Sequence, residues 1–137
     1  LKVGMEVSVA CPEGYDPDQQ VLDFAKGSPE HKFSLFRTPK EAAAGADVMI
    51  TDVWASMGQE EEKAVRVKAF QGYQINEELM ALTNPGCMVQ HCLPAHRGEE
   101  ITADVFEAHA GEIFDEAENR LHAQKAVMYL LMKEEEP

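Results

Sequence analysis

Short apolar segments alternate with helix-forming segments along the whole chain, and this alternation limits the possible fold more than any other feature. Five segments are predicted to be strands: Val3–Ala10, Lys32–Arg37, Asp47–Asp52, Cys87–Cys92 and Glu112–Asp115. Strands that alternate with helices indicate an α/β fold built on parallel strands. We therefore expect a doubly wound parallel sheet of about five strands with helices on both faces, a Rossmann-like architecture.

Capping signals and apolar spacing place helices between these strands. The predicted helices are Asp18–Ala25, a short segment from Thr38 to Gly45, Gln59–Phe70, Asn76–Leu82, Thr102–Ala108 and a last helix from about Asn119. In the last helix one apolar face is predicted to be buried, and it comprises Ala123, Ala126, Val127, Leu130 and Leu131.

The 137 residues suit one domain with its own core, and the composition restricts its partners. A net charge of −13 disfavours nucleic-acid binding, which needs a basic surface. No apolar run reaches the roughly 18 residues of a membrane span, so no membrane partner is expected. Three cysteines without a framework spacing indicate a reducing compartment, and we expect a cytoplasmic protein. Because Leu1 lies within a strand-like pattern, we also expect a fragment of a longer chain.

Three segments leave predicted strands at the edge where ligands bind in sheets of this kind: Asp52–Gln59, His91–Pro94 and Asp115–Arg120. In the first, Ser56 has the spacing of a capping box with Gln59 and can simply cap a helix. Free N–H groups at a helix start also suit a carboxylate, and Asp52 can hold an ammonium group. Together they resemble a clamp for a zwitterionic amino acid.

Cys92 ends a predicted strand and is either a small core residue or a ligand-facing thiol. Pro94 predicts an extended backbone at Leu93, with its carbonyl free to face a ligand. A metal site from Cys87, His91 and Cys92 is not expected, because neighbouring strand residues point to opposite faces.

Arg120 admits two interpretations. It either forms a surface ion pair with Glu116 or Glu118, or binds a phosphate or carbonyl oxygen in a bidentate manner. A nucleophilic pair of Cys92 with His96 is a further possibility, although no third residue is identified that would orient it.

Three motifs resemble signatures of the ornithine carbamoyltransferases: Asp52-x-Trp54-x-Ser56-Met57-Gly58, His91-Cys92-Leu93-Pro94 and Glu116-Ala117-Glu118-Asn119-Arg120. The resemblance covers essentially all of residues 1–137 and corresponds only to the C-terminal, ornithine-binding domain. It implies transfer of a carbamoyl group from carbamoyl phosphate to the δ-amine of L-ornithine, giving L-citrulline and phosphate.

The resemblance also implies two groups of ligand-binding residues. The α-amino and carboxylate groups of ornithine would be held by Asp52, Ser56 and Met57. The residues that would contact the δ-amine and the carbamoyl phosphate are Cys92, Leu93 and Arg120. Asp52 and a Cys92 thiolate are expected to be catalytic by positioning the amine and accepting its proton. The resemblance implies no metal, no cofactor and no covalent intermediate.

The carbamoyl-phosphate motif of that family, Ser-x-Arg-Thr-Arg, does not occur in the sequence. We therefore expect the isolated chain to be inactive without the N-terminal carbamoyl-phosphate domain, which is its implied partner within a homotrimer or larger assembly. The loop from His96 to Glu100 resembles that of many microbial biosynthetic members of the family, and this resemblance implies a role in arginine biosynthesis. Two alternatives are a carbamoyltransferase for putrescine or an acylated ornithine, and a non-catalytic amino-acid-binding module. A nucleotide-binding domain is disfavoured because no Gly-x-Gly-x-x-Gly follows the first strand.

Overall fold

The computed structural model describes residues 1–27, 30, 32–55 and 60–133. In these ranges the strands are β1 (Val7–Ala10), β2 (Phe33–Phe36), β3 (Val48–Thr51) and β4 (Met88–His91). The helices are α1 (Gln19–Lys26), α2 (Pro39–Ala43), α3 (Glu60–Ala69), α4 (Glu77–Met80), α5 (Ala103–Ala108) and α6 (Ala110–Met132). At least one helix therefore separates each of the described strands from the next, and the predicted α/β class with parallel strands is confirmed.

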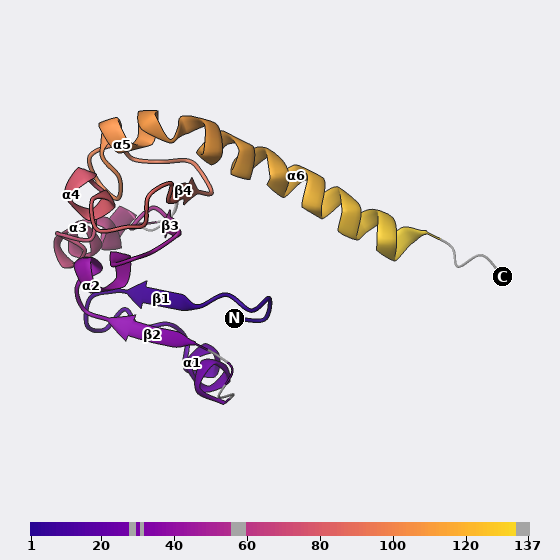
Figure 1. Ribbon diagram of the computed structural model, residues 1–137, viewed down its shortest axis with the longest axis horizontal. Helices are drawn as coiled ribbons and strands as arrows, with labels where there is room; N and C mark the ends of the chain where they lie inside the picture. The colour runs from indigo at the N-terminus through magenta and orange to yellow at the C-terminus, as the bar shows by residue number, and fades with distance from the viewer. Residues whose placement is uncertain (28–29, 31, 56–59, 134–137) are drawn as a thin grey trace.

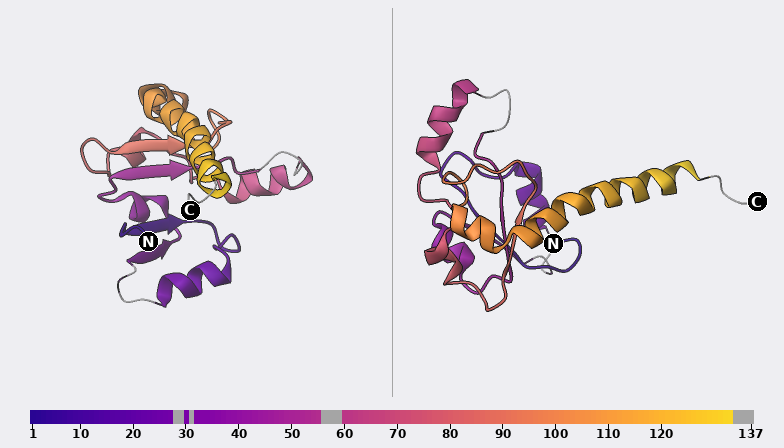
Figure 2. Two further views of the ribbon diagram at one scale, coloured as in Figure 1. Left: turned by 90° about the vertical axis from the view of Figure 1, so that its right-hand side faces the viewer. Right: turned by 90° about the horizontal axis from the view of Figure 1, so that it is seen from above.

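The four strands form two parallel pairs. β1 pairs with β2, where Val7 lies opposite Phe33, and β3 pairs with β4, where Val48 lies opposite Met88. Figures 1 and 2 show β1 and β3 as the facing strands of the two pairs, but no hydrogen-bonded ladder joins them within the described ranges. The prediction of one continuous sheet is therefore wrong for this structure.

The strand predicted at Glu112–Asp115 is also wrong, because these residues lie in α6, which begins at Ala110 instead of near Asn119. Ile113 is fully buried in the core, and the Glu112 carboxylate accepts a hydrogen bond of 2.7 Å from the Val89 N–H. A side chain thus occupies the edge of β4 that a fifth strand would use. Ala110 and Glu112, in the first turn of α6, are also of residue types that favour a helix over a strand.

The main core lies on one face of the β3–β4 pair. It comprises the buried residues Ala43, Ile75, Leu79, Val89, Ile101, Val105, Phe106 and Ile113. Met49 lies opposite Val89 in the ladder and packs against this core. Ile50 and Met88 face the other way, because side chains alternate along a strand, and they are 70% and 45% exposed. The predicted cover of helices on both faces is therefore missing from this pair among the residues described.

The long helix α6 projects from the body of the molecule (Figures 1 and 2). Its predicted buried face is wrong, since Val127, Leu130 and Leu131 are all exposed. Within α6 the one buried residue is Ile113, which lies near the start of the helix and before the predicted face. Despite their lengths, none of the described helices is apolar over a long enough stretch to cross a membrane.

Candidate functional site

The site begins where β3 and β4 end side by side. Thr51 pairs with His91 in the ladder, so the next residues, Asp52 and Cys92, leave the two strands at neighbouring points. The Cys92 thiol donates a hydrogen bond of 3.4 Å to Asp52 Oδ1. The Val53 N–H donates to the same oxygen at 2.7 Å and fixes the orientation of the carboxylate. The structure therefore brings together the two residues expected to be catalytic.

The surroundings of Cys92 keep it protonated. Burial, the hydrogen bond to Asp52 and the negative charges of Asp52 and Glu116 together raise the pKa of the Cys92 thiol. An ordinary cysteine pKa is already about 8.5, so Cys92 is a thiol at neutral pH. The expectation of a thiolate is wrong for this structure, because acidic neighbours disfavour a second negative charge.

Glu116 is a site residue that the sequence reasoning considered only as an ion-pair partner of Arg120. It comes from α6, and its Oε2 atom is buried with no hydrogen-bond partner among the described residues. Its charge reaches Cys92 strongly enough to raise the thiol pKa. The sequence signal that could have identified Glu116 as a site residue was its place in the same motif as Arg120. Asp52, Cys92 and Glu116 define what we call the acidic cradle, which suits a cationic amine.

Leu93 follows the cradle with an unusual backbone. Its φ angle is +53°, in the left-handed region, and its peptide bond to Pro94 is cis. The extended conformation predicted from Pro94 is therefore wrong. The Leu93 N–H instead folds back to donate to His91 Nδ1 at 3.0 Å. Within the described ranges no hydrogen bond uses the Leu93 carbonyl, as expected for a ligand-facing group.

Asp52, His91 and Cys92 also have possible metal-ligand atoms within 4.8 Å of one another. The argument that His91 and Cys92 point apart does not hold, because β4 ends at His91. His91 is nevertheless a poor ligand here, since Nδ1 accepts the Leu93 N–H and Nε2 lies 3.1 Å from Glu100 Oε1. Both ring nitrogens are occupied, and the arrangement fits a hydrogen-bond network better than a metal centre.

A second group of possible ligands consists of His96, Glu99 and Glu100. Glu99 pairs with Lys63 at 3.2 Å, and the His96 ring lies 4.0 Å from Glu100 Oε2. The Lys63 ammonium already supplies the positive charge beside Glu99. In the part of the chain that is described, no hydrogen bond joins His96 to Cys92, so the structure gives no support to a Cys–His nucleophilic pair.

Arg120 is exposed on α6, one helical turn after Glu116. It forms no ion pair with Glu116 or Glu118 in the structure, and Glu118 instead pairs with His122 at 3.2 Å. Its guanidinium therefore has no partner among the residues described. Ser56 and Met57, the other predicted ornithine ligands, lie outside the described residues.

Aromatic packing supports the segment that follows Asp52. Trp54 stacks on Phe70, with ring centroids 6.1 Å apart, and Phe70 packs edge-on against Tyr73 at 5.8 Å. The contact joins the segment after β3 to the end of α3, so aromatic packing two residues after Asp52 helps to fix the position of Asp52.

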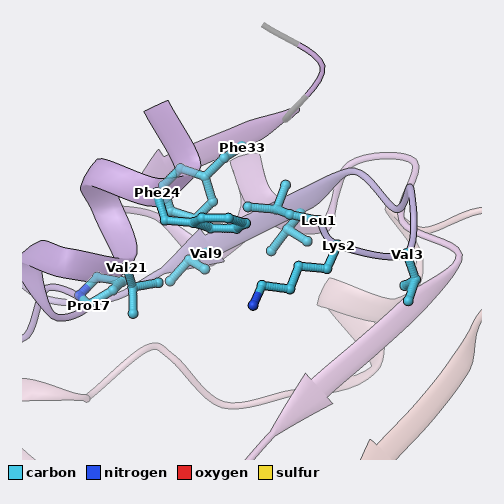
Figure 3. Close-up of a pocket in the computed structure, with 9 residues that line it drawn as sticks. Leu1, Lys2, Val3, Val9, Pro17, Val21, Phe24 and Phe33 are labelled. Atoms are coloured by element: carbon cyan, nitrogen blue, oxygen red, sulfur yellow. The ribbon is translucent and has the colours of Figure 1, made fainter. Parts of the chain in front are cut away.

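A hollow of about 480 Å³ lies elsewhere, between the N-terminal turn, α1 and the β1–β2 pair (Figure 3). Its walls are mainly apolar, including Val9, Val21 and Phe33, and it shares no residue with the cradle. Lys2 extends over the Phe24 ring at 5.3 Å on this surface. The hollow lacks the convergent polar groups of an amino-acid site.

Comparison with known proteins places this geometry in a family. The family described as "Aspartate/ornithine carbamoyltransferase, Asp/Orn binding domain" matches residues 1–131. The ornithine carbamoyltransferase of Geobacter metallireducens is 55% identical over 131 residues, which cover 96% of this chain and 43% of that protein. The chain belongs to the aspartate/ornithine carbamoyltransferase family and contains its Asp/Orn-binding domain.

Solved structures agree with this assignment. The anabolic ornithine carbamoyltransferase of Campylobacter jejuni superposes with a TM-score of 0.88 at 42% identity, covering 94% of this chain and 44% of that one. The ornithine carbamoyltransferase of Pyrococcus furiosus gives 0.84 at 49% identity, covering 94% and 42%. The chain thus spans less than half the length of the relatives it matches.

Proposed function

We propose that this chain supplies the ornithine side of an ornithine carbamoyltransferase active site. The acidic cradle carries the proposal, because it gathers a carboxylate, a thiol and a second carboxyl group at the ends of two paired strands. A flexible diamine such as ornithine presents an ammonium group of matching charge. The family membership supports the same substrate class.

The cradle addresses the main difficulty of the reaction. An alkyl ammonium with a pKa near 10.4 is the free amine in roughly one molecule in 2,500 at pH 7, which adds about 4–5 kcal/mol to the barrier. In the proposed mechanism the δ-ammonium loses its proton to the Asp52 carboxylate, with Cys92 as the neighbouring hydrogen-bond donor. The amine then attacks the carbamoyl carbon, the carbon–oxygen bond to phosphate breaks, and the phosphate leaves with the second proton of the amine.

The remaining ligand contacts are also proposals. Ser56 and the Met57 backbone, together with Asp52, would hold the α-amino and carboxylate groups of ornithine. The Leu93 carbonyl would accept a hydrogen bond from the amine or the carbamoyl group. Arg120 is available to bind carbamoyl phosphate, because its guanidinium lacks an ion-pair partner among the described residues.

The rest of the active site would come from an N-terminal carbamoyl-phosphate domain. We propose that the whole enzyme is a cytoplasmic homotrimer or larger assembly that serves arginine biosynthesis. In it, the two strand pairs would belong to one doubly wound sheet covered on both faces. The unpaired, facing edges of β1 and β3 support the single sheet, because free strand edges tend to pair. Exposed Ile50 supports the second cover, because it is apolar surface that further chain can bury.

The test is calorimetric titration of L-ornithine, L-norvaline and putrescine into this chain, with and without carbamoyl phosphate and the carbamoyl-phosphate domain of a relative. We expect ornithine to bind more tightly than norvaline, which lacks the δ-amine, and Asp52→Asn to remove that preference. Asp104→Asn removes an exposed acid outside the cradle and serves as the matched control.

Three results would count against the proposal. Equal affinity for ornithine and norvaline in the presence of the second domain would contradict the proposal that the cradle binds the δ-amine. Tighter binding of putrescine would favour the alternative substrate. Citrulline formation at a normal rate by this chain alone would contradict the need for a second domain.

A further inference from the structure

A buried hydrogen-bond network adjoins the acidic cradle. His91 and Glu100 are both fully buried, and His91 Nε2 lies 3.1 Å from Glu100 Oε1. Burying a carboxylate is costly unless its oxygens receive hydrogen bonds. The presence of Glu100 at a fully buried position therefore needs an explanation other than packing.

The network reaches both ends of the loop that carries Cys92. At one end, the Leu93 N–H donates to His91 Nδ1 at 3.0 Å. At the other end, the His96 N–H donates to Glu100 Oε1 at 2.5 Å. The same carboxylate oxygen thus connects the end of β4 to the residue that follows Pro94 and Ala95. Glu100 is itself anchored, because its carbonyl accepts the Ile75 N–H at 2.9 Å.

The hydrogen bonds also determine which nitrogen of His91 carries the proton. Nδ1 accepts the Leu93 N–H, so it must be unprotonated, and Nε2 must carry the proton that faces Glu100. Glu100 favours this tautomer because a carboxylate accepts and cannot donate. If the proton moved to Nδ1, two donors would face each other and Leu93 would lose its bond.

Leu93 needs that bond more than an ordinary residue would. Its φ of +53° is a conformation that a leucine rarely adopts, and such backbones persist only where neighbouring groups hold them. Cys92 directly precedes it, so the direction of the thiol towards Asp52 depends on the same short turn.

The geometry points to Glu100 as a positioning residue, which fixes the Nε2–H tautomer of His91 and through it the turn that aims Cys92 and the Leu93 carbonyl at the substrate. This inference rests on the proposed function for its catalytic meaning, but the arrangement is tested without substrate. It separates Glu100 from Glu99, whose side chain pairs with Lys63 and not with the loop.

The experiment compares the wild-type chain with Glu100→Leu, Glu100→Gln and the matched control Glu99→Gln. Long-range ¹H–¹⁵N spectra report the tautomer of His91, and alkylation by iodoacetamide, followed on the Cys92 peptide by mass spectrometry, reports the loop. Both are measured well below the unfolding temperature of each variant, so a purely stabilising role of Glu100 would leave them unchanged.

We expect Nε2–H in the wild type, in Glu99→Gln and in Glu100→Gln, whose amide oxygen can still accept. Glu100→Leu should move the proton to Nδ1 and release the loop. Cys92 would then leave its burial and its acidic neighbours, and its pKa would fall. Each unit of decrease should raise the alkylation rate at pH 7 about three- to fourfold, because a gain in thiolate outweighs a loss of nucleophilicity.

A wild-type His91 with its proton on Nδ1 would overturn the inference, as would a Glu100→Leu variant with unchanged tautomer or unchanged alkylation. If Glu100→Leu does not fold, the wild-type chain still decides, since hydrogen exchange must show protected amides at Leu93 and His96. Fast exchange at either amide would contradict the network. None of these measurements involves ornithine, so their outcome is independent of the calorimetric test.

Discussion

Cys92 and Asp52 lie 40 residues apart in the sequence, yet the thiol of one donates a 3.4 Å hydrogen bond to the carboxylate of the other. The contact exists because β3 and β4 are parallel neighbours that end at the same level. A thiol placed against a carboxylate holds its proton more strongly than an isolated thiol does.

Removing the negative charge of Asp52 should therefore lower the pKa of Cys92. In Asp52→Asn the amide oxygen can still accept the thiol hydrogen, while the repulsion between carboxylate and thiolate is lost. We expect the pH profile of Cys92 alkylation to move to lower pH and the rate at pH 7.0–8.0 to rise. Asp104→Asn is the control, and an unmoved profile in Asp52→Asn would show that the charge of Asp52 does not contribute to the raised pKa.

Glu112 should matter for stability, although it lies on a helix surface beside the sheet. Its carboxylate accepts the Val89 N–H at 2.7 Å, and Val89 is fully buried. Glu112→Ala leaves that donor unsatisfied and should lower the free energy of unfolding by about 1–3 kcal/mol in urea titrations. Glu112→Gln should cost less, and Glu118→Ala, an exposed site on the same helix, should change little.

Ile113 is the residue that anchors α6 to the core, and it is fully buried. Ile113→Ala should destabilise the chain by about 2–5 kcal/mol, and Ile113→Val by about 0.5–1.5 kcal/mol, because the cavity grows with the volume removed. Leu121→Ala changes an exposed leucine of the same helix and should have a much smaller effect. Equal losses at Ile113 and Leu121 would mean that α6 is held in another way.

The exposed apolar side chains of α6 should promote self-association of the chain. Leu131 is 81% exposed, and Leu131→Lys should shift sedimentation profiles towards smaller species at high protein concentration. Gln124→Lys adds the same charge on this helix without removing apolar surface. If both variants dissociate the chain equally, the added charge rather than lost apolar contact is the cause.

The sequence allowed the α/β class, four of the five strands and the meeting of Asp52 with Cys92 to be predicted. These depend on local patterns and on one rule, that parallel strands present their ends at a common edge. The predicted strands were longer than the observed ones, as expected where the ends of strands are determined by tertiary contacts.

The role of Glu116 could not be predicted, because it depends on where α6 begins. A short segment such as Glu112–Asp115 is compatible with either a strand or a helix, and the choice was made by Ile113 entering the core. The backbone of Leu93 was missed for a similar reason. A proline predicts its neighbour's preference, but a hydrogen bond to His91 outweighs that preference.

The separation of the strands into two pairs bears on how cooperatively the chain unfolds. Every cradle residue belongs to β3, β4 or α6 and their connections, whereas β1, β2 and α1 contribute none. The two parts are joined through α2, through a 2.5 Å hydrogen bond from the Tyr73 hydroxyl to the Arg37 carbonyl, and through an edge-on contact between the Tyr15 and Phe70 rings at 4.9 Å. We expect β1–β2 amides to exchange with solvent in an earlier, separate opening, while the part that bears Asp52 and Cys92 stays folded.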